Sequence, residues 1–184
     1  MDYFDKAETW DRATLETVQL ARLKTTIQQA SRAPFYAKRL AEAGVSADNL
    51  RSLEDIRRIP FTSKDDLRSQ YPYGLATVPH SEFVRMHCSS GTTGTPVAVC
   101  YTQSDINSWA DLMARCLYMA GVRKDDVFQN MSGYGLFTGG LGAHYGGEAA
   151  GCTVIPTSSG NTKRQIQMMK DPVSYTHLTL PTKA

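Results

Sequence analysis

The segment from residue 126 to residue 156 has the order strand, glycine-rich turn, helix, strand. Strand-like runs form its two ends, 126–131 and 153–156, and glycines recur through 133–147. Neighbouring strands joined by a helix run parallel, because the helix carries the chain back to the end of the sheet where the first strand began. The segment therefore predicts an α/β fold with a βαβ unit. Ligands of such sheets bind at the carboxyl ends of the strands, where this turn falls.

Three interpretations of the glycine-rich turn remain open from its residues. The first is a dinucleotide-binding fingerprint. The turn fits it poorly, because it lacks the third glycine and has bulky side chains where a backbone would have to approach pyrophosphate. In a ligand pocket, Tyr134 and Phe137 would wall an apolar slot, and Gly139 and Gly140 would leave space for a flat ring. In a purely structural turn, the glycines would serve only close packing of the helix on the sheet. His144, the imidazole near the turn, is interpreted as a structural residue.

A hydroxyl-rich stretch before Pro96 is the second candidate ligand site. It consists of Ser89, Ser90, Gly91, Thr92, Thr93, Gly94 and Thr95. Strand-like runs at 82–87 and 97–101 make it the tip of a predicted hairpin. Because glycine lets backbone N–H groups point inward and the hydroxyls add donors, the stretch favours an anion, and a polyphosphate fits best. A plain hairpin loop is the alternative, and the Gly-Lys-Ser or Gly-Lys-Thr of a Walker A loop is absent.

Helices are predicted on both sides of this hairpin. They cover 10–30, 35–43, two short segments within 53–68, residues 102–120, and a last helix that begins at Asn161 or Thr162. Pro34 is expected to end the first helix, and Gly44 has the position of a left-handed cap for the second. Two capping boxes, Ser63 with Asp66 and Thr102 with Asp105, mark further helix starts.

Composition and charge limit which kinds of binding partner and which cellular compartment the sequence predicts. The 184 residues carry a net charge of +2 with scattered Lys and Arg, which gives no electrostatic footprint for nucleic acid. Acidic residues follow Met1 where a signal peptide would be basic and then apolar, and no apolar run has membrane-spanning length. The four cysteines lack Cys-x-x-Cys spacing, so buried free thiols in the cytoplasm are expected, with no metal site.

The order of these motifs resembles that of the phenylacetate–CoA ligases, a family of adenylate-forming enzymes. Residues 89–96 resemble the nucleotide-binding loop of that superfamily, with Thr95 where a lysine commonly follows the last glycine. Further similar segments are 59–68, 71–75, 133–146, 151–156 and 159–165. The resemblance is continuous and in register from Tyr3 to about Asp171, so it rests on a series of motifs rather than on one.

The resemblance implies the fold class and the domain limits. The chain is expected to be α/β, with N-terminal helices followed by a βαβ-containing mixed sheet, as part of the large N-terminal domain of an adenylate-forming enzyme. We expect a helical region at 1–80 and a partial AMP-binding α/β domain at 81–171. Residues 172–184 abandon the family pattern and resemble translated sequencing-adaptor tails, so a non-native tail is expected there.

The activity that the resemblance implies is activation of an aryl acid, phenylacetate first, through an acyl-adenylate to its coenzyme A thioester. ATP, Mg²⁺ and coenzyme A are the implied cofactors. By position, Ser89 to Thr95 would bind the phosphates of ATP, and Tyr134, Phe137, Gly139 and Gly140 would line the acid pocket. No catalytic residue and no metal ligand is assigned.

The resemblance also limits what the chain would do alone. The family's catalytic lysine, adenine site and coenzyme A site would lie beyond it, so the chain by itself is expected to be inactive. The complete protein is expected to act on a small-molecule aryl acid, without nucleic acid or membrane partners, and a homodimer is the assembly considered. Two alternatives remain: an adenylating enzyme that passes the acyl group to a carrier protein, and an inactive small-molecule-binding protein on the same scaffold.

Overall fold

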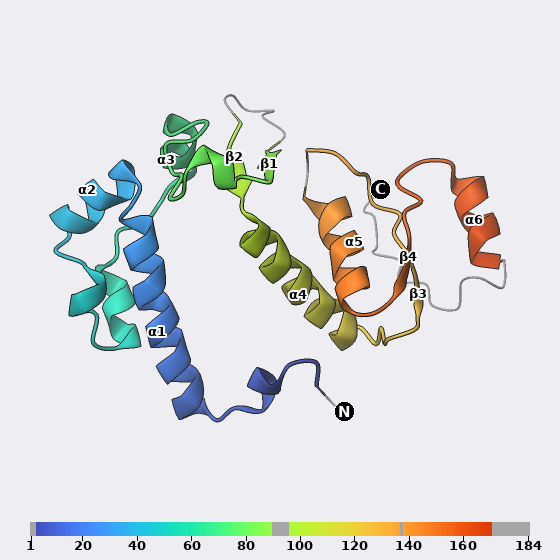
Figure 1. Cartoon of the computed structure of the whole chain (residues 1–184), viewed down its shortest axis with the longest axis horizontal. Coiled ribbons are helices and arrows are strands. Elements are labelled where there is room, and N and C mark those ends of the chain that lie inside the picture. Colours follow the sequence, from blue (N-terminus) through green and yellow to red (C-terminus); the bar gives the residue numbers. More distant parts are fainter. Residues whose placement is uncertain (1–2, 90–95, 137, 171–184) are drawn as a thin grey trace. The chain divides into compact units, whose positions relative to one another are not determined.

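The computed structural model describes residues 3–89, 96–136 and 138–170 (Figure 1). The chain forms two compact units. One unit runs from Asp5 to Cys100, and the other contains Tyr3, Phe4 and the chain from Tyr101 onward. The division between the compact units follows Cys100, later in the chain than the predicted boundary after residue 80.

The first unit is helical up to its hairpin. Its helices are η1 (Lys6–Thr9), α1 (Arg12–Ala30), α2 (Pro34–Glu42), η2 (Ala47–Asn49), η3 (Leu53–Arg58), α3 (Lys64–Ser69) and η4 (His80–Glu82). The predicted helices are confirmed, and Gly44 caps α2 with a φ of 61°. Pro34 does more than follow the end of α1, because it is also the first residue of α2. Proline is tolerated at this position, since the N–H that it lacks would have no partner in the first turn of a helix.

Two contacts hold these helices together. Ile27, Leu40, Val45 and Leu50 form the buried core of the unit. Arg39 on α2 donates to Asp66 Oδ2 on α3 at 2.9 Å, and the same carboxylate accepts the Ser63 N–H at 2.7 Å in the predicted capping box. The apolar cluster joins α1 to α2 and to the segment around η2, and the charged contact joins α2 to α3.

The hairpin consists of β1 (Arg85–Cys88) and β2 (Ala98–Tyr101), which pair in a two-stranded sheet. The connection between them is too short for a parallel crossover, so the strands run antiparallel. The predicted strand at 82–87 begins late, because residues 80–82 form the helical turn η4. The hydroxyl-rich stretch therefore connects two paired strands, as predicted.

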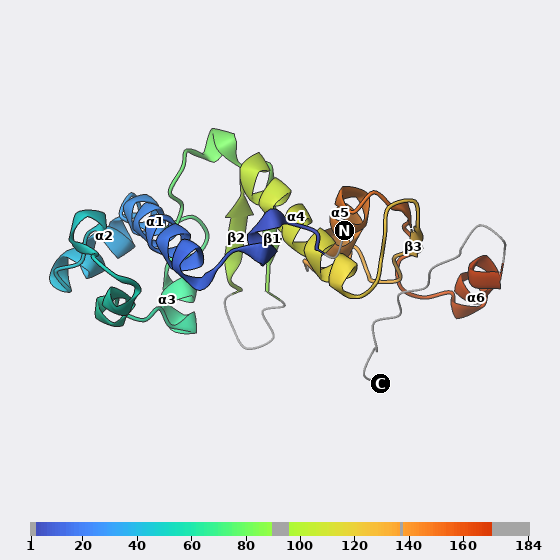
Figure 2. The same ribbon diagram turned by 90° about the horizontal axis from the view of Figure 1, so that it is seen from below.

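The second unit contains the predicted βαβ segment (Figure 2). Its elements are α4 (Gln103–Met119), β3 (Val127–Gln129), α5 (Gly139–Ala149), β4 (Thr153–Ile155) and α6 (Thr162–Lys170). β3 and β4 pair in parallel, with Phe128 opposite Val154. The α/β class is confirmed, although the described strands form two separate two-stranded sheets rather than one mixed sheet.

Glycines let α5 pack closely on its neighbours. A Cβ atom at Gly142 would lie 2.5 Å from the ring of Trp109, and one at Gly146 would lie 2.5 Å from Met113 Cβ, both on α4. A Cβ at Gly147 would lie 2.8 Å from Val154 and 2.9 Å from Phe128 on the parallel strands. Side chains at these positions would therefore force α5 away from both α4 and the sheet.

The cysteines are free thiols, as predicted, but they are not uniformly buried. Cys88, Cys100 and Cys152 are half-buried, whereas Cys116 is exposed. The expectation of a buried thiol is wrong for Cys116, because successive residues point about 100° apart around a helix and its neighbour Leu117 occupies the buried face.

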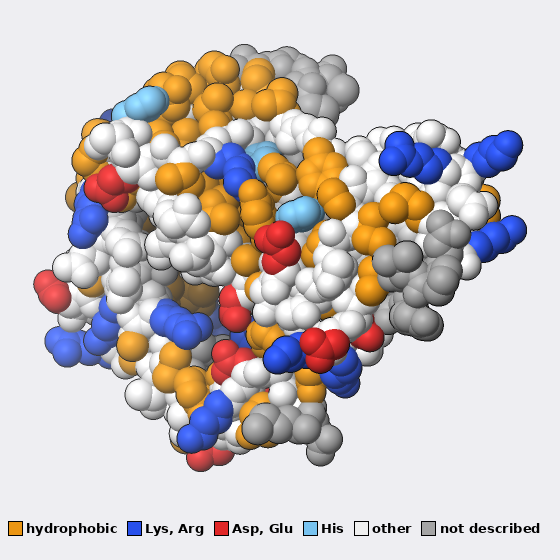
Figure 3. Space-filling view, turned by 45° about the vertical axis from the view of Figure 1, so that its right-hand side comes forward, with side chains coloured by type: hydrophobic (Ala, Val, Ile, Leu, Met, Phe, Trp, Pro, Cys, Tyr) orange, Lys and Arg blue, Asp and Glu red, His pale blue; other side chains and the backbone are white. Residues whose placement is uncertain are grey.

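The described surface also exposes apolar side chains, and Figure 3 shows hydrophobic groups at several places on the face it views. Phe61 is 96% exposed, Met119 82% and Leu136 67%. Among the described residues, no helix has both the length and the apolar composition needed to cross a membrane.

Replacing Gly146 by Ala tests the packing of α5. Alanine favours a helix over glycine by about 1 kcal/mol, but overpacking costs about 1–3 kcal/mol. The obstruction includes main-chain atoms of Met113 and Ala114, which cannot move independently of α4, so the steric cost should prevail. We expect the Gly146→Ala chain to melt several degrees below the wild type in circular dichroism. Gly135→Ala, where a Cβ meets open space, should melt near the wild type; a Gly146→Ala variant as stable as the wild type would contradict the packing argument.

The pH dependence of stability tests the contact between α2 and α3. The N–H and hydroxyl of Ser63, and then Arg39, lower the pKa of Asp66 from its ordinary value of 3.8. A lowered folded-state pKa gives stability that is present above 3.8 and is lost as the pH falls through the folded value. Asp66→Asn should therefore melt below the wild type at neutral pH, and the difference should shrink as the pH falls below 3.8.

A matched control for this series is Asp65→Asn on the same helix. The Asp65 side chain is 88% exposed and forms a surface ion pair with the nearby Arg68, so its removal should change the melting temperature little. A constant difference between Asp66→Asn and the wild type across the whole pH range would show that the ionised carboxylate does not stabilise this contact.

Candidate functional site

Ser89 closes the connection between β1 and β2. Its backbone N–H donates to the carbonyl of Val97 at 2.9 Å, and its hydroxyl oxygen accepts the N–H of Val97, also at 2.9 Å. The hydroxyl can still donate its own proton to a ligand. The remaining predicted phosphate-binding residues lie outside the described part of the chain: Ser90, Gly91, Thr92, Thr93, Gly94 and Thr95.

The thiols near the candidate sites are poor nucleophiles. Burial raises the pKa of Cys100, and the neighbouring Cys88 raises it further. Burial also raises the pKa of Cys152, with a further contribution from Asp126. Because the thiolate is the reactive form, neither cysteine is a candidate for covalent catalysis.

Asn130 organises the glycine-rich turn at the carboxyl end of β3. The residue is only 2% exposed, and its N–H donates to the carbonyl of Ile155 at 2.9 Å. Its side-chain Nδ2 donates to Tyr134 Oη at 2.8 Å and to the carbonyl of Gly140 at 2.7 Å. Its Oδ1 accepts the N–H of Ser132 at 3.1 Å. One buried amide thus ties the strand, the turn and the start of α5 together.

Asn130 was not among the site residues predicted from the sequence. The available signal was a polar residue directly after an apolar strand, at the end where ligands of parallel sheets bind. The partners of its side chain lie up to ten residues away in the chain and that of its backbone N–H, Ile155, lies farther still, so only the folded structure shows that they converge.

His144 extends this network along α5. Its Nδ1 lies 3.1 Å from Tyr134 Oη, and its Nε2 lies 3.2 Å from Glu148 Oε1. Asn130 donates to Tyr134 Oη, so the phenol can donate its own proton to His144 Nδ1. In that tautomer the ring proton is on Nε2, which donates to Glu148. Both ring nitrogens of His144 therefore have partners within the protein, which is consistent with the structural interpretation of this residue.

The surroundings of Tyr134 keep its phenol protonated. Burial raises the pKa of Tyr134 above its ordinary value of 10.0, the hydrogen bond from Asn130 opposes this shift, and the charge of Glu148 raises it further. The hydroxyl is therefore a neutral group whose hydrogen bonds are made within the protein. The ring, rather than the hydroxyl, is the part of Tyr134 left to contact a ligand.

The structure also places two of the three other predicted acid-pocket residues. Gly139 and Gly140 form the first positions of α5, while Phe137 lies outside the described residues. A Cβ at Gly140 would collide with the carbonyl oxygen of Gly133. Close packing of the turn therefore accounts for glycine at 140, and the role of these residues in acid binding stays a prediction.

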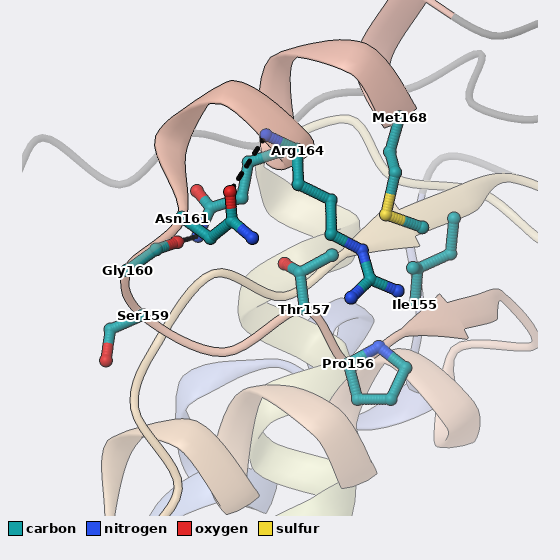
Figure 4. A pocket seen from close by; sticks show the side chains of 9 residues that line it. Ile155, Pro156, Thr157, Ser159, Gly160, Asn161, Arg164 and Met168 are labelled. Carbon is teal, nitrogen blue, oxygen red and sulfur yellow. Dashed lines mark hydrogen bonds between the residues drawn. The ribbon is translucent and has the colours of Figure 1, made fainter.

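Two cavities lie beside the parallel strands. One, of about 330 Å³, lies where β4 leads into α6, and Figure 4 shows the Arg164 side chain reaching across it beside Thr157 and Pro156. The other, of about 620 Å³, is lined by side chains of α4, β3 and α6, including Phe128 and the buried amide of Gln129. Tyr134, Gly139 and Gly140 are not among the residues that line either cavity.

Metal binding has no cluster to support it in the described part of the chain. Among residues 3–89, 96–136 and 138–170, no three His, Cys, Asp or Glu side chains lie close enough together to hold an ion.

Comparison with known proteins gives relatives of one kind. The chain is 52% identical over 168 residues to a phenylacetate-coenzyme A ligase of Pseudomonas putida, a match that covers 91% of the chain and 38% of the relative. It is 49% identical over 172 residues to the phenylacetate-coenzyme A ligase of Thermus thermophilus, covering 93% of the chain and 39% of that relative. The chain thus spans about two fifths of the length of these relatives. No model of a protein family matches it.

Solved structures agree with this assignment. A 2-hydroxyisobutyryl-CoA ligase in the postadenylation state, in complex with 2-HIB-AMP, superposes with a TM-score of 0.83 at 29% identity, covering 92% of this chain and 37% of that one. An open conformation of the same ligase, in complex with 2-HIB-AMP and CoA, gives the same TM-score and identity over 41% of its chain. With close to half of its residues identical to named relatives across nine tenths of its length, the chain belongs to the phenylacetate–coenzyme A ligase family.

Proposed function

We propose that the protein containing this chain activates an aryl acid, with phenylacetate as the first candidate, through an acyl-adenylate to its coenzyme A thioester. The identity of about one half to phenylacetate-coenzyme A ligases carries the proposal. A structural relative whose complex contains an acyl-AMP and CoA supports the same two-step reaction, and it favours coenzyme A over a carrier protein as the acceptor.

The first step is a problem of charge. A carboxylate must attack the α-phosphorus of ATP, which is itself surrounded by negative charge, so donors and a metal ion have to stabilise the charge that moves onto pyrophosphate. We assign the donors to Ser89 through Thr95, whose ends are joined by the two Ser89–Val97 hydrogen bonds. Mg²⁺ would be held mostly by phosphate oxygens and water, as is usual for this ion.

The acid would bind beside the glycine-rich turn. This turn follows β3 at the carboxyl end of the parallel pair, where ligands of such sheets bind. Because the hydroxyl of Tyr134 is hydrogen-bonded within the protein, its ring offers an apolar face to an aromatic acid. Phe137, Gly139 and Gly140 complete the proposed pocket.

We further propose that the 184-residue chain does not catalyse the reaction by itself. It spans 38% and 39% of the length of the two phenylacetate-coenzyme A ligases, and it exposes apolar side chains such as Phe61 and Leu136. Adenylation and thioester formation are therefore best measured in a chimera. In this chimera, residues 3–170 replace the matching segment of the Pseudomonas putida ligase.

The chimera tests the function directly. Phenylacetate and ATP should give pyrophosphate release, and coenzyme A should then give phenylacetyl-CoA. The isolated chain should give neither product. Pyrophosphate release without thioester formation, restored by a carrier protein, would favour the alternative acceptor. No pyrophosphate release from any aryl acid would contradict the proposal.

Substitutions in the hydroxyl-rich stretch test the assignment of the ATP site. Thr93→Val and Thr95→Val would each remove a donor to a charged phosphate, an interaction worth about 1.5–3 kcal/mol. In the chimera, the KM for ATP should rise roughly tenfold to a hundredfold, while the KM for phenylacetate should change little. Thr26→Val, on the exposed side of α1, is the matched control and should alter neither constant. Equal increases in both KM values would contradict a phosphate-binding role.

A further inference from the structure

We propose that Asn130 is a positioning residue for the acid pocket: its side-chain amide fixes the ring of Tyr134 and the first turn of α5 before the acid binds. This inference rests on the proposed function, because it concerns the pocket of that same reaction. It assigns a role to a residue that does not itself belong to the predicted pocket.

The chemistry of the site requires an amide. Both hydrogens of Nδ2 are used, one for Tyr134 Oη at 2.8 Å and one for the Gly140 carbonyl at 2.7 Å. The Oδ1 atom accepts the N–H of Ser132 at 3.1 Å. A carboxylate would keep the acceptor but lose both donors, and an apolar side chain would leave three polar groups without their partner. Asparagine therefore satisfies the site as a whole.

Tyr134 depends on this amide for its orientation. It lies in a turn whose neighbours Gly135 and Leu136 are exposed, and it belongs to no helix or strand. Its polar contacts are Asn130 and His144, which hold the phenol from two sides. A ring that is already fixed loses no rotational freedom when a ligand packs against it, so binding of the acid is favoured.

The second hydrogen of the amide acts on α5. It donates to the carbonyl of Gly140. At this residue the backbone of Gly133 lies so close that a Cβ atom on Gly140 would collide with it. The two contacts together fix the distance between the turn and the helix. We therefore expect loss of the amide to change binding of the acid and to leave binding of ATP unchanged.

The complete 184-residue chain provides the first measurement. In the wild type, nuclear magnetic resonance couplings of Tyr134 should report a single χ1 rotamer, and His144 should show the tautomer with its proton on Nε2. Asn130→Asp should average the Tyr134 rotamers. Rotamer averaging of Tyr134 in the folded wild-type chain would overturn the proposal, whatever the activity of the ligase.

The second measurement uses the chimera. Asn130→Asp keeps the acceptor for Ser132 and removes both donors. The KM for phenylacetate should rise about tenfold, as expected when the hydrogen bond that holds Tyr134 is lost, while the KM for ATP stays within about twofold. In a Tyr134→Phe background, which lacks the phenol oxygen, the same substitution should have a smaller effect. Independent effects of the two substitutions would overturn the coupling through Tyr134.

Gln129→Glu is the matched control. Gln129 is the neighbouring buried amide, also 2% exposed, but its Nε2 points to the Gln165 carbonyl instead of the turn. Its substitution should lower the melting temperature without changing the ratio of the two KM values. If Asn130→Asp behaves like Gln129→Glu, Asn130 is only structural. An inactive wild-type chimera would instead contradict the proposed function, and the rotamer measurement would still decide the role of Asn130.

Discussion

The close approach of α5 to α4 and to the parallel strands is the constraint on which the second unit depends. Gly142 and Gly146 leave room for Trp109 and Met113, and Gly147 leaves room for Phe128 and Val154. This contact places the start of α5 at the carboxyl end of β3. With side chains at these positions the helix would stand farther away, and Asn130 could not reach both the turn and the helix. One packing interaction thus builds the core and positions the candidate site.

Much of the fold could be predicted because its signals are local. The capping boxes of Ser63 with Asp66 and of Thr102 with Asp105 are contained within four residues each, and both are present. The βαβ unit was predicted from alternating apolar and glycine-rich segments, and its strands pair in parallel. These features depend on neighbours in the chain, which a single sequence displays directly.

Other features of the fold were not marked by such a signal in the sequence. The first strand begins at Arg85 because a helical turn occupies 80–82, and the exposure of Cys116 follows from which face of α4 is buried. The Asn130 network joins residues from 130 to 148 through side chains of two elements and a turn. No periodicity or spacing in the sequence specifies such a network.

The chemistry of the candidate site was likewise only partly predictable from the sequence. Ser89 was predicted as a donor to phosphate, and its hydroxyl oxygen also accepts the N–H of Val97. Tyr134 was predicted as an apolar wall, and its hydroxyl is held by Asn130 and His144. Residue type suggested which groups a site needs, whereas the structure shows which of their atoms are already engaged.

The pairing of Ser89 with Val97 has a consequence for how such a stretch can change during evolution. Its two ends are joined through main-chain atoms and one hydroxyl, so the anchor does not depend on the side chains between them. A substitution at Thr95 would leave this anchor intact. Substitutions at the interior positions, where the phosphates of ATP are proposed to bind, can therefore accumulate without changing the contact that joins the two ends.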